Sequence, residues 1–108
     1  MLRTLAMALF CLGVAGTAVR AEPPGKTAEI AISAFAFVPS TLSVKRGTTV
    51  VWVNHDETPH NVVATAGQFK SPALNSNDAF RWTFDKPGNY AYFCRLHPHM
   101  TGKVEVTP

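Results

Sequence analysis

Hydrophobic and polar residues alternate along most of the chain, which is the pattern of short, half-buried β-strands. Ile30 and Ile32 share one face of one such run, and Tyr92 and Cys94 share one face of another. We expect strands over residues 28–33, 41–44, 48–54, 61–64, 80–84, 90–94 and 102–106. No long window has the period of a helix. Residues 66–77 are the least regular, and we expect a loop there with one helical turn.

The number and length of these runs predict the fold class. About seven short strands without helices, in 108 residues, indicate one all-β domain, a small Greek-key β-sandwich. Trp52 and Trp82 fall within the strand patterns, so we expect both side chains in the core rather than on a route for electrons. A core of this size gives marginal stability, to which a bound metal would add.

Residues 1–21 have the composition of a secretory signal peptide. Arg3 supplies a positive start, residues 5–15 an apolar stretch, and Val19 and Ala21 the small residues of a cleavage site. The apolar stretch is too short to span a bilayer. We therefore expect cleavage after Ala21 and an exported, periplasmic domain of residues 22–108.

The net charge of the whole chain, +3, owes much to Arg3 and Arg20 in the predicted signal peptide. Without them the domain is close to neutral and has no basic stripe, so we expect no nucleic-acid partner. No second apolar stretch is long enough to span a membrane. We expect a monomer whose partners are other proteins.

The candidate chemistry lies near the C-terminus. Cys94 is the single cysteine of residues 22–108, so a disulfide within the domain is excluded, and an unpaired thiol in an oxidising compartment needs burial or a metal. We expect Cys94 at the end of a strand, and His97 and Met100 in a tight turn before the last strand. His60 is expected at the start of a different strand, which a sandwich can bring to the same pole.

One thiolate, two imidazoles and one thioether are the ligands of a type 1, or blue, copper site. In such sites two His and one Cys form a plane, and a weakly bound Met lies on the axis. Soft sulfur ligands suit Cu(I) and imidazole suits both oxidation states, so little rearrangement accompanies electron transfer. The sequence thus predicts a protein that shuttles single electrons between periplasmic redox partners and is not an enzyme.

Other interpretations fit these residues less well. A copper-trafficking or copper-storage protein would have clusters of exposed Met or His residues, whereas residues 22–108 contain one Met. A hydrolase with Cys94 as nucleophile and His97 as base has poor geometry at this spacing. A zinc site would not be expected to include Met. His55 and His99 are expected at the surface, although His99 could replace a ligand.

The chain resembles the cupredoxins, the small blue copper proteins, and among them it is most similar to the amicyanins. The resemblance covers nearly the whole domain and is strongest over residues 57–62, 86–94 and 102–106. The spacing of Cys94, His97 and Met100 matches the short amicyanin-type loop. The resemblance implies that these three residues and His60 bind copper.

The resemblance also implies roles for residues around the ligands. Asn61 would tie the loop of the upstream His ligand to the Cys loop and tune the thiolate by hydrogen bonding. The edge of His97 would reach the surface in an apolar patch where electron donor and acceptor proteins dock. Leu96 stands where amicyanins have Pro, and His99 where they usually have an aromatic residue. Both differences lie on the expected docking face, so the identity of the partners does not follow from the resemblance.

Overall fold

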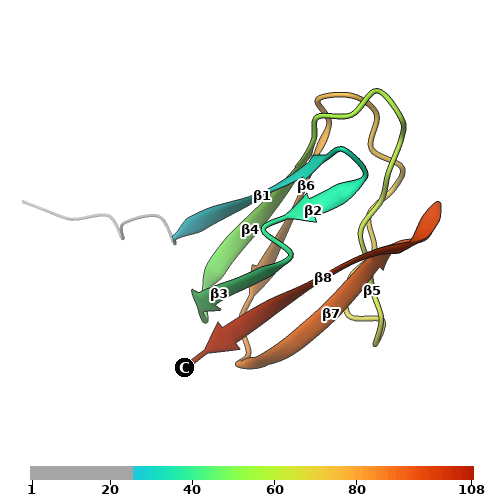
Figure 1. The fold of residues 1–108 in the computed structure, drawn as a ribbon. Coiled ribbons are helices and arrows are strands. Elements are labelled where there is room, and N and C mark those ends of the chain that lie inside the picture. The colour runs from blue at the N-terminus through green and yellow to red at the C-terminus, as the bar shows by residue number, and fades with distance from the viewer. Residues whose placement is uncertain (1–25) are drawn as a thin grey trace, which may run out of the picture.

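The computed structural model describes residues 26–108, which form two facing β-sheets (Figure 1). The predicted signal peptide, residues 1–21, lies outside the described residues. The strands are β1 (Thr27–Ser33), β2 (Ala36–Val38), β3 (Thr41–Lys45), β4 (Thr48–Asn54), β5 (Val63–Ala64), β6 (Ala79–Phe84), β7 (Gly88–Cys94) and β8 (His97–Thr107).

The strand order is that of a Greek-key β-sandwich, as predicted. One sheet has the order β2-β1-β4-β6, and the other has the order β3-β8-β7-β5. β1 pairs in parallel with β4, and β3 pairs in parallel with β8, whereas the remaining pairs are antiparallel. The chain changes sheet after each strand from β2 to β6, so its consecutive loops cross the two ends of the sandwich.

The predicted strands are present, but several of their bounds differ, and β7 starts at Gly88 rather than Tyr90. β5 starts at Val63 rather than Asn61, and β8 starts at His97 rather than Gly102. β2 was not expected. The predicted helical turn within residues 66–77 is wrong, because this segment pairs with the chain before it through two isolated bridges, Val63 with Lys70 and His60 with Leu74. Among the described residues, no helix is long and apolar enough to cross a membrane.

The core lies between the sheets and consists mainly of residues that alternate along the strands, together with a few from the loops on either side of β5. Ile30, Ile32, Trp52 and Cys94 are each fully buried, which confirms the faces expected for β1 and β7 and the core position expected for Trp52. The other buried hydrophobic members of this cluster are Phe37, Val50, Val62, Ala64, Phe69, Leu74, Phe84, Tyr92, Met100, Val104 and Val106. Two of the candidate ligands, Cys94 and Met100, therefore belong to the core itself.

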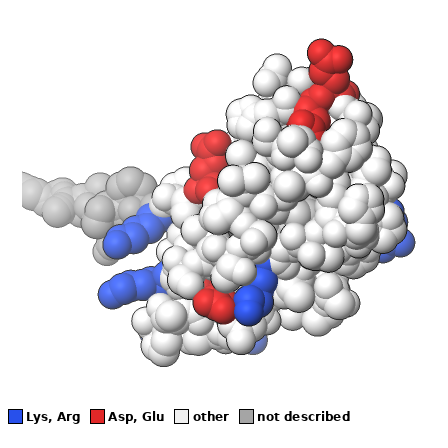
Figure 2. All heavy atoms as spheres, in the orientation of Figure 1, with Lys and Arg blue, Asp and Glu red and all other residues white. Residues whose placement is uncertain are grey.

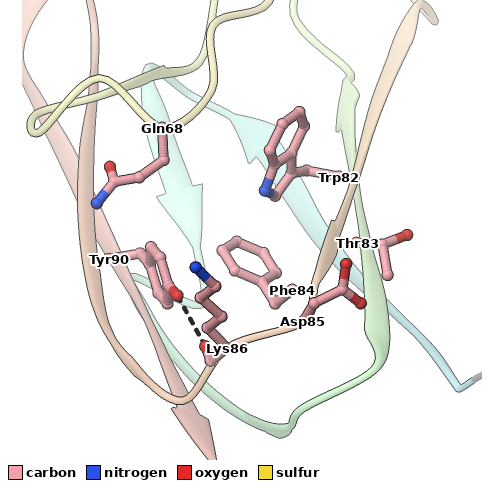
Figure 3. A pocket seen from close by; sticks show the side chains of 7 residues that line it. All are labelled: Gln68, Trp82, Thr83, Phe84, Asp85, Lys86 and Tyr90. Carbon is pink, nitrogen blue, oxygen red and sulfur yellow. Dashed lines mark hydrogen bonds between the residues drawn. The ribbon is translucent and has the colours of Figure 1, made fainter.

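The prediction that Trp82 lies in the core is wrong, because its side chain is 38% exposed. It lies on β6, an edge strand of its sheet. The centroid of its ring is 5.6 Å from that of the Phe69 ring, at the side of the sandwich where the space between the sheets is open to solvent. There it lines a pocket of about 200 Å³ together with Phe84, Lys86 and Tyr90 (Figure 3). None of the residues that line this pocket belongs to the predicted metal site.

The visible surface has no concentrated charge. Figure 2 shows Lys, Arg, Asp and Glu side chains of both signs at scattered places on this face, with wide uncharged areas between them. No basic stripe crosses this face, as expected from the near neutrality of residues 22–108.

Candidate metal centre

Cys94 and His97 face each other across the hairpin that joins β7 to β8. They form the last cross-strand pair of this hairpin, after an irregularity in the register between Phe93 and Cys94. We expected His97 and Met100 in a turn before the last strand, but both lie in the first part of β8. The pairing of β7 with β8 therefore includes Cys94 and His97 and holds them more firmly than a free turn would, whereas residues 98–100 have no partner on β7.

His60 enters the site from the long loop between β4 and β5. It was expected at the start of a strand, but it lies before β5 in an isolated bridge. Its backbone N–H donates to the Leu74 carbonyl at 3.2 Å, and its carbonyl accepts from the Leu74 N–H at 2.7 Å. The side chain is fully buried. The bridge fixes the backbone of His60 even though no strand contains it.

Asn54, at the end of β4, organises the loop that carries His60. Its buried side-chain amide donates to the carbonyls of Thr58 and Leu74, at 3.0 and 2.9 Å. Its side-chain oxygen accepts the backbone N–H of Asp56 at 2.9 Å, the arrangement of an Asx-turn. One buried amide thus satisfies three backbone groups of the loops around the site.

The predicted nitrogen and sulfur ligands converge at one point. The ligand atoms of His60, Cys94 and His97 all lie within 4.8 Å of one another. The Cys94 Sγ lies 3.8 Å from Nδ1 of His60 and 3.8 Å from Nδ1 of His97. Metal bonds of about 2.0 Å to nitrogen and about 2.3 Å to sulfur, at an angle of about 120°, would separate these atoms by about 3.7 Å. The three residues therefore fit a metal ion held between them.

Met100 supplies the remaining group that a type 1 copper site requires. Its side chain is 3% exposed and belongs to the same core cluster as Cys94. Together, His60, Cys94, His97 and Met100 form the pattern of a type 1 copper site. His55 and His99 are both exposed, as expected, and neither joins the cluster of ligand atoms.

Asn61 links the two loops of the site, as the resemblance implied. Its backbone N–H donates to the Cys94 Sγ at 3.4 Å, and its side-chain oxygen accepts the backbone N–H of Arg95 at 2.7 Å. A donor directed at the sulfur favours the thiolate form, and the second bond fixes the residue after the cysteine. Asn61 is 8% exposed, and its bond to the Cys94 sulfur is buried.

Asp56 is a site residue that the sequence analysis did not identify. Its carboxylate accepts Nε2–H of His60 at 2.9 Å, which leaves Nδ1 of that ring free to face Cys94. Burial alone would raise the pKa of Asp56, but hydrogen bonds from the backbone of Phe35 and Ala34 and from His60 lower it below its ordinary value. The only sequence signal was a carboxylate four residues before a candidate ligand, which is too common to be informative.

Three comparisons with known proteins agree with this site. Residues 25–107 match the family described as copper binding proteins, plastocyanin/azurin family. Amicyanin of Paracoccus versutus is 31% identical, over 94% of this chain and 90% of the relative. Amicyanin-alpha of Methylorubrum extorquens is 37% identical, over 82% and 78%. A solved purple cupredoxin from Nitrosopumilus maritimus is 36% identical, with a TM-score of 0.69 over 74% of this chain and 99% of that one.

Proposed function

The chain belongs to the copper-binding proteins of the plastocyanin/azurin family, the cupredoxins, and we propose that it carries single electrons between two redox proteins of the periplasm. The observation that supports this most directly is the convergence of the ligand atoms of His60, Cys94 and His97 within 4.8 Å. We assign these residues and Met100 as the ligands of one copper ion. The amicyanin relatives belong to a class of electron carriers rather than enzymes, and we place this chain in the same class.

A copper ion in this site would accept and release one electron by alternating between Cu(II) and Cu(I). The chain contributes a fixed arrangement of ligands. Cys94 and His97 are held by the β7–β8 pairing, and His60 is held by its bridge to Leu74. Because these positions depend on sheet and loop hydrogen bonds, a change of oxidation state requires little movement of the protein. Small movement favours fast electron transfer.

His97 is the proposed point at which electrons enter and leave. His60 and Cys94 are fully buried, whereas His97 is partly exposed. Leu96, beside it in the hairpin, is a large apolar side chain that is 50% exposed. We propose that the donor and acceptor proteins dock on the apolar surface around these two residues.

The alternatives have less support. The described residues contain one methionine, Met100, and its side chain is buried rather than available to deliver copper to a partner. A hydrolase would require an accessible nucleophile, but the Cys94 side chain is fully buried. Electron transfer is therefore the function that this site supports best.

Export and oligomeric state are also proposals. We propose that residues 1–21 are removed as a signal peptide, and that residues 22–108 act in the periplasm as a monomer. N-terminal sequencing of the protein purified from the periplasm would identify the cleavage site. A mature protein that begins at Glu22 is the expected result.

The carrier function is tested by electron self-exchange between the reduced and oxidised copper-loaded protein. We expect rapid exchange of electrons while the copper resists removal by a chelator. Leu96→Glu should slow self-exchange without changing the visible spectrum, because it places charge on the proposed docking surface. Val38→Glu, at an equally exposed site on β2, is the matched control and should have a smaller effect. Slow self-exchange combined with rapid transfer of copper to a chelator would contradict the proposal.

A further inference from the structure

The turn between β1 and β2 has an unusual backbone. Ser33 pairs with Ala36, so that Ala34 and Phe35 form a two-residue hairpin loop. Both have positive φ, 51° for Ala34 and 60° for Phe35. Turns with this geometry ordinarily contain Asn and Gly, and a large aromatic residue is an outlier there. Such a conformation persists where the surroundings hold it, and it often marks a functional position.

Asp56 holds this turn and the ligand His60 at the same time. Its Oδ1 accepts the backbone N–H of Ala34 at 2.8 Å, and its Oδ2 accepts the backbone N–H of Phe35 at 2.9 Å. The same Oδ2 accepts Nε2–H of His60 at 2.9 Å. The Asp56 side chain is 15% exposed, and its bond to His60 is the more buried of the three. The position of Phe35 is thereby coupled to that of a copper ligand.

The ring of Phe35 contacts both imidazoles of the site. Its centroid lies 5.0 Å from that of His60 and 5.0 Å from that of His97, at interplanar angles of 86° and 85°. The two imidazoles are 4.9 Å apart. Edge-to-face contacts of this kind are favourable. Phe35 remains 45% exposed while His60 is fully buried, so the phenyl ring stands between solvent and the imidazole pair.

We propose that Phe35 is a positioning residue of the copper site, held by Asp56 in a strained turn so that its ring excludes water from His60 and His97 and fixes their orientation. This inference depends on the proposed copper site. Water near the ligands would stabilise the more highly charged Cu(II) form, so its exclusion raises the reduction potential. Because the imidazoles of His60 and His97 are also held in place, they should move away from the copper ion less often, and copper should leave the site more slowly.

Three variants separate the phenyl ring from the turn. Phe35→Ala removes the ring but keeps a residue that is strained at positive φ. The double variant Ala34→Asn/Phe35→Gly also removes the ring, but it supplies the residues that this turn prefers. We therefore expect its apoprotein to be at least as stable to urea as the unaltered apoprotein. Phe35→Tyr keeps an aromatic ring and should restore the properties of the unaltered protein.

The measurements are the rate at which a chelator removes Cu(I) and the reduction potential of the copper-loaded protein. For both variants without the ring we expect copper removal about tenfold faster. We also expect an equilibrium constant for reduction up to about tenfold lower, which is up to about 59 mV for one electron. Val38→Ala, which removes an exposed apolar side chain from the same hairpin, is the control and should change neither quantity.

The outcomes distinguish this inference from the proposed function. If the two variants without the ring keep the release rate and potential of the unaltered protein, Phe35 has no positioning role and the inference is wrong. If Phe35→Tyr is as impaired as Phe35→Ala, the aromatic contact is not the cause. If the unaltered protein forms no blue site with copper, the proposed function itself fails.

Discussion

Asn61 shows how a residue that is not a ligand acts on the site through hydrogen bonds. Its side chain accepts the N–H of Arg95, while its backbone N–H points at the Cys94 sulfur. Asn61→Ala would remove the hydrogen bond from the Arg95 N–H. The backbone N–H that points at the Cys94 sulfur would then be held less firmly in position. We expect copper affinity to fall by about 10- to 100-fold, the usual effect of losing such a partner.

Competition with a chelator of known affinity measures this change. His99→Phe is the control, because His99 is exposed and lies outside the cluster of ligand atoms. It should keep the affinity and the visible spectrum almost unchanged. Loss of copper binding in His99→Phe, or no loss in Asn61→Ala, would contradict these assignments.

Tyr92 makes the apoprotein sensitive to alkali. Its hydroxyl is buried without a hydrogen-bond partner, and burial raises its pKa from 10.0 to about 12. The unfolded chain therefore loses this proton at lower pH than the folded protein, and stability falls as pH rises from 10 to 12. The loss should reach about 2 kcal/mol by pH 12.

Urea unfolding of the apoprotein at pH 8 and pH 11.5 measures this effect. Tyr92→Phe should lose less stability over that interval than the unaltered protein. Tyr90→Phe is the control, because the Tyr90 hydroxyl is exposed and donates to the Lys86 carbonyl. Equal alkaline losses in the unaltered protein and in Tyr92→Phe would refute the assignment.

The roles of some residues could be predicted from the sequence, and those of others could not. The ligand set could be predicted because thiolate, imidazole and thioether together suit few metals. Asp56 could not, since only the folded loop brings its carboxylate to Nε2 of His60. Trp82 was placed in the core because its strand alternates correctly, but an edge strand leaves part of its inner face uncovered. Edge and centre are properties of the sheet, which the alternation of one strand does not reveal.

Gly102 is required at the pairing of β7 with β8. It lies opposite Tyr92, and a Cβ at this position would overlap the Tyr92 phenol ring. That ring is buried against Trp52 and Phe37, so it has little room to move. Gly102→Ala should therefore destabilise the protein by about 1–3 kcal/mol, as overpacking does. Urea unfolding would measure the change, and Thr101→Ala, at an exposed neighbouring position, should have a much smaller effect.

A strand could be predicted from the sequence where its own residues strongly favour β-structure. β4 matched its predicted range because β-branched and aromatic residues fill it without interruption. β2 was not predicted because it has only three residues. In addition, Ala34 and Phe35 occupy a tight turn in which Asn and Gly are typical, so the sequence does not indicate a hairpin there. The early start of β8 depends on pairing between Cys94 and His97, which the Pro and His residues of that segment do not indicate.

The whole molecule should be stabilised by its metal. The ligands come from the β4–β5 loop and from the β7–β8 hairpin, so the complete site exists only in the folded chain. Binding to the folded state alone stabilises it by about 2.7 kcal/mol when free metal is 100 times its dissociation constant. We expect the Tm to rise with copper concentration, as measured by thermal unfolding. Cys94→Ser should show a smaller rise, and an equal rise would indicate that copper binds elsewhere.

The fold class was predictable because strand alternation extends over most of the chain, but alternation does not indicate which distant residues converge. That His60 and Cys94 meet was expected from their chemistry and from resemblance to a family. The structure supplies the physical reason, which is that the bridge between His60 and Leu74 and the bond from Asn61 to the Cys94 sulfur bring two loops together.

The visible absorption spectrum of the purified domain after addition of one equivalent of Cu(II) tests the central claim most directly. If Cys94, His60, His97 and Met100 bind one copper ion, the protein turns intensely blue, and Cys94→Ser does not. A protein that stays colourless with Cu(II), or a Cys94→Ser variant that keeps the intense blue colour, would contradict the account.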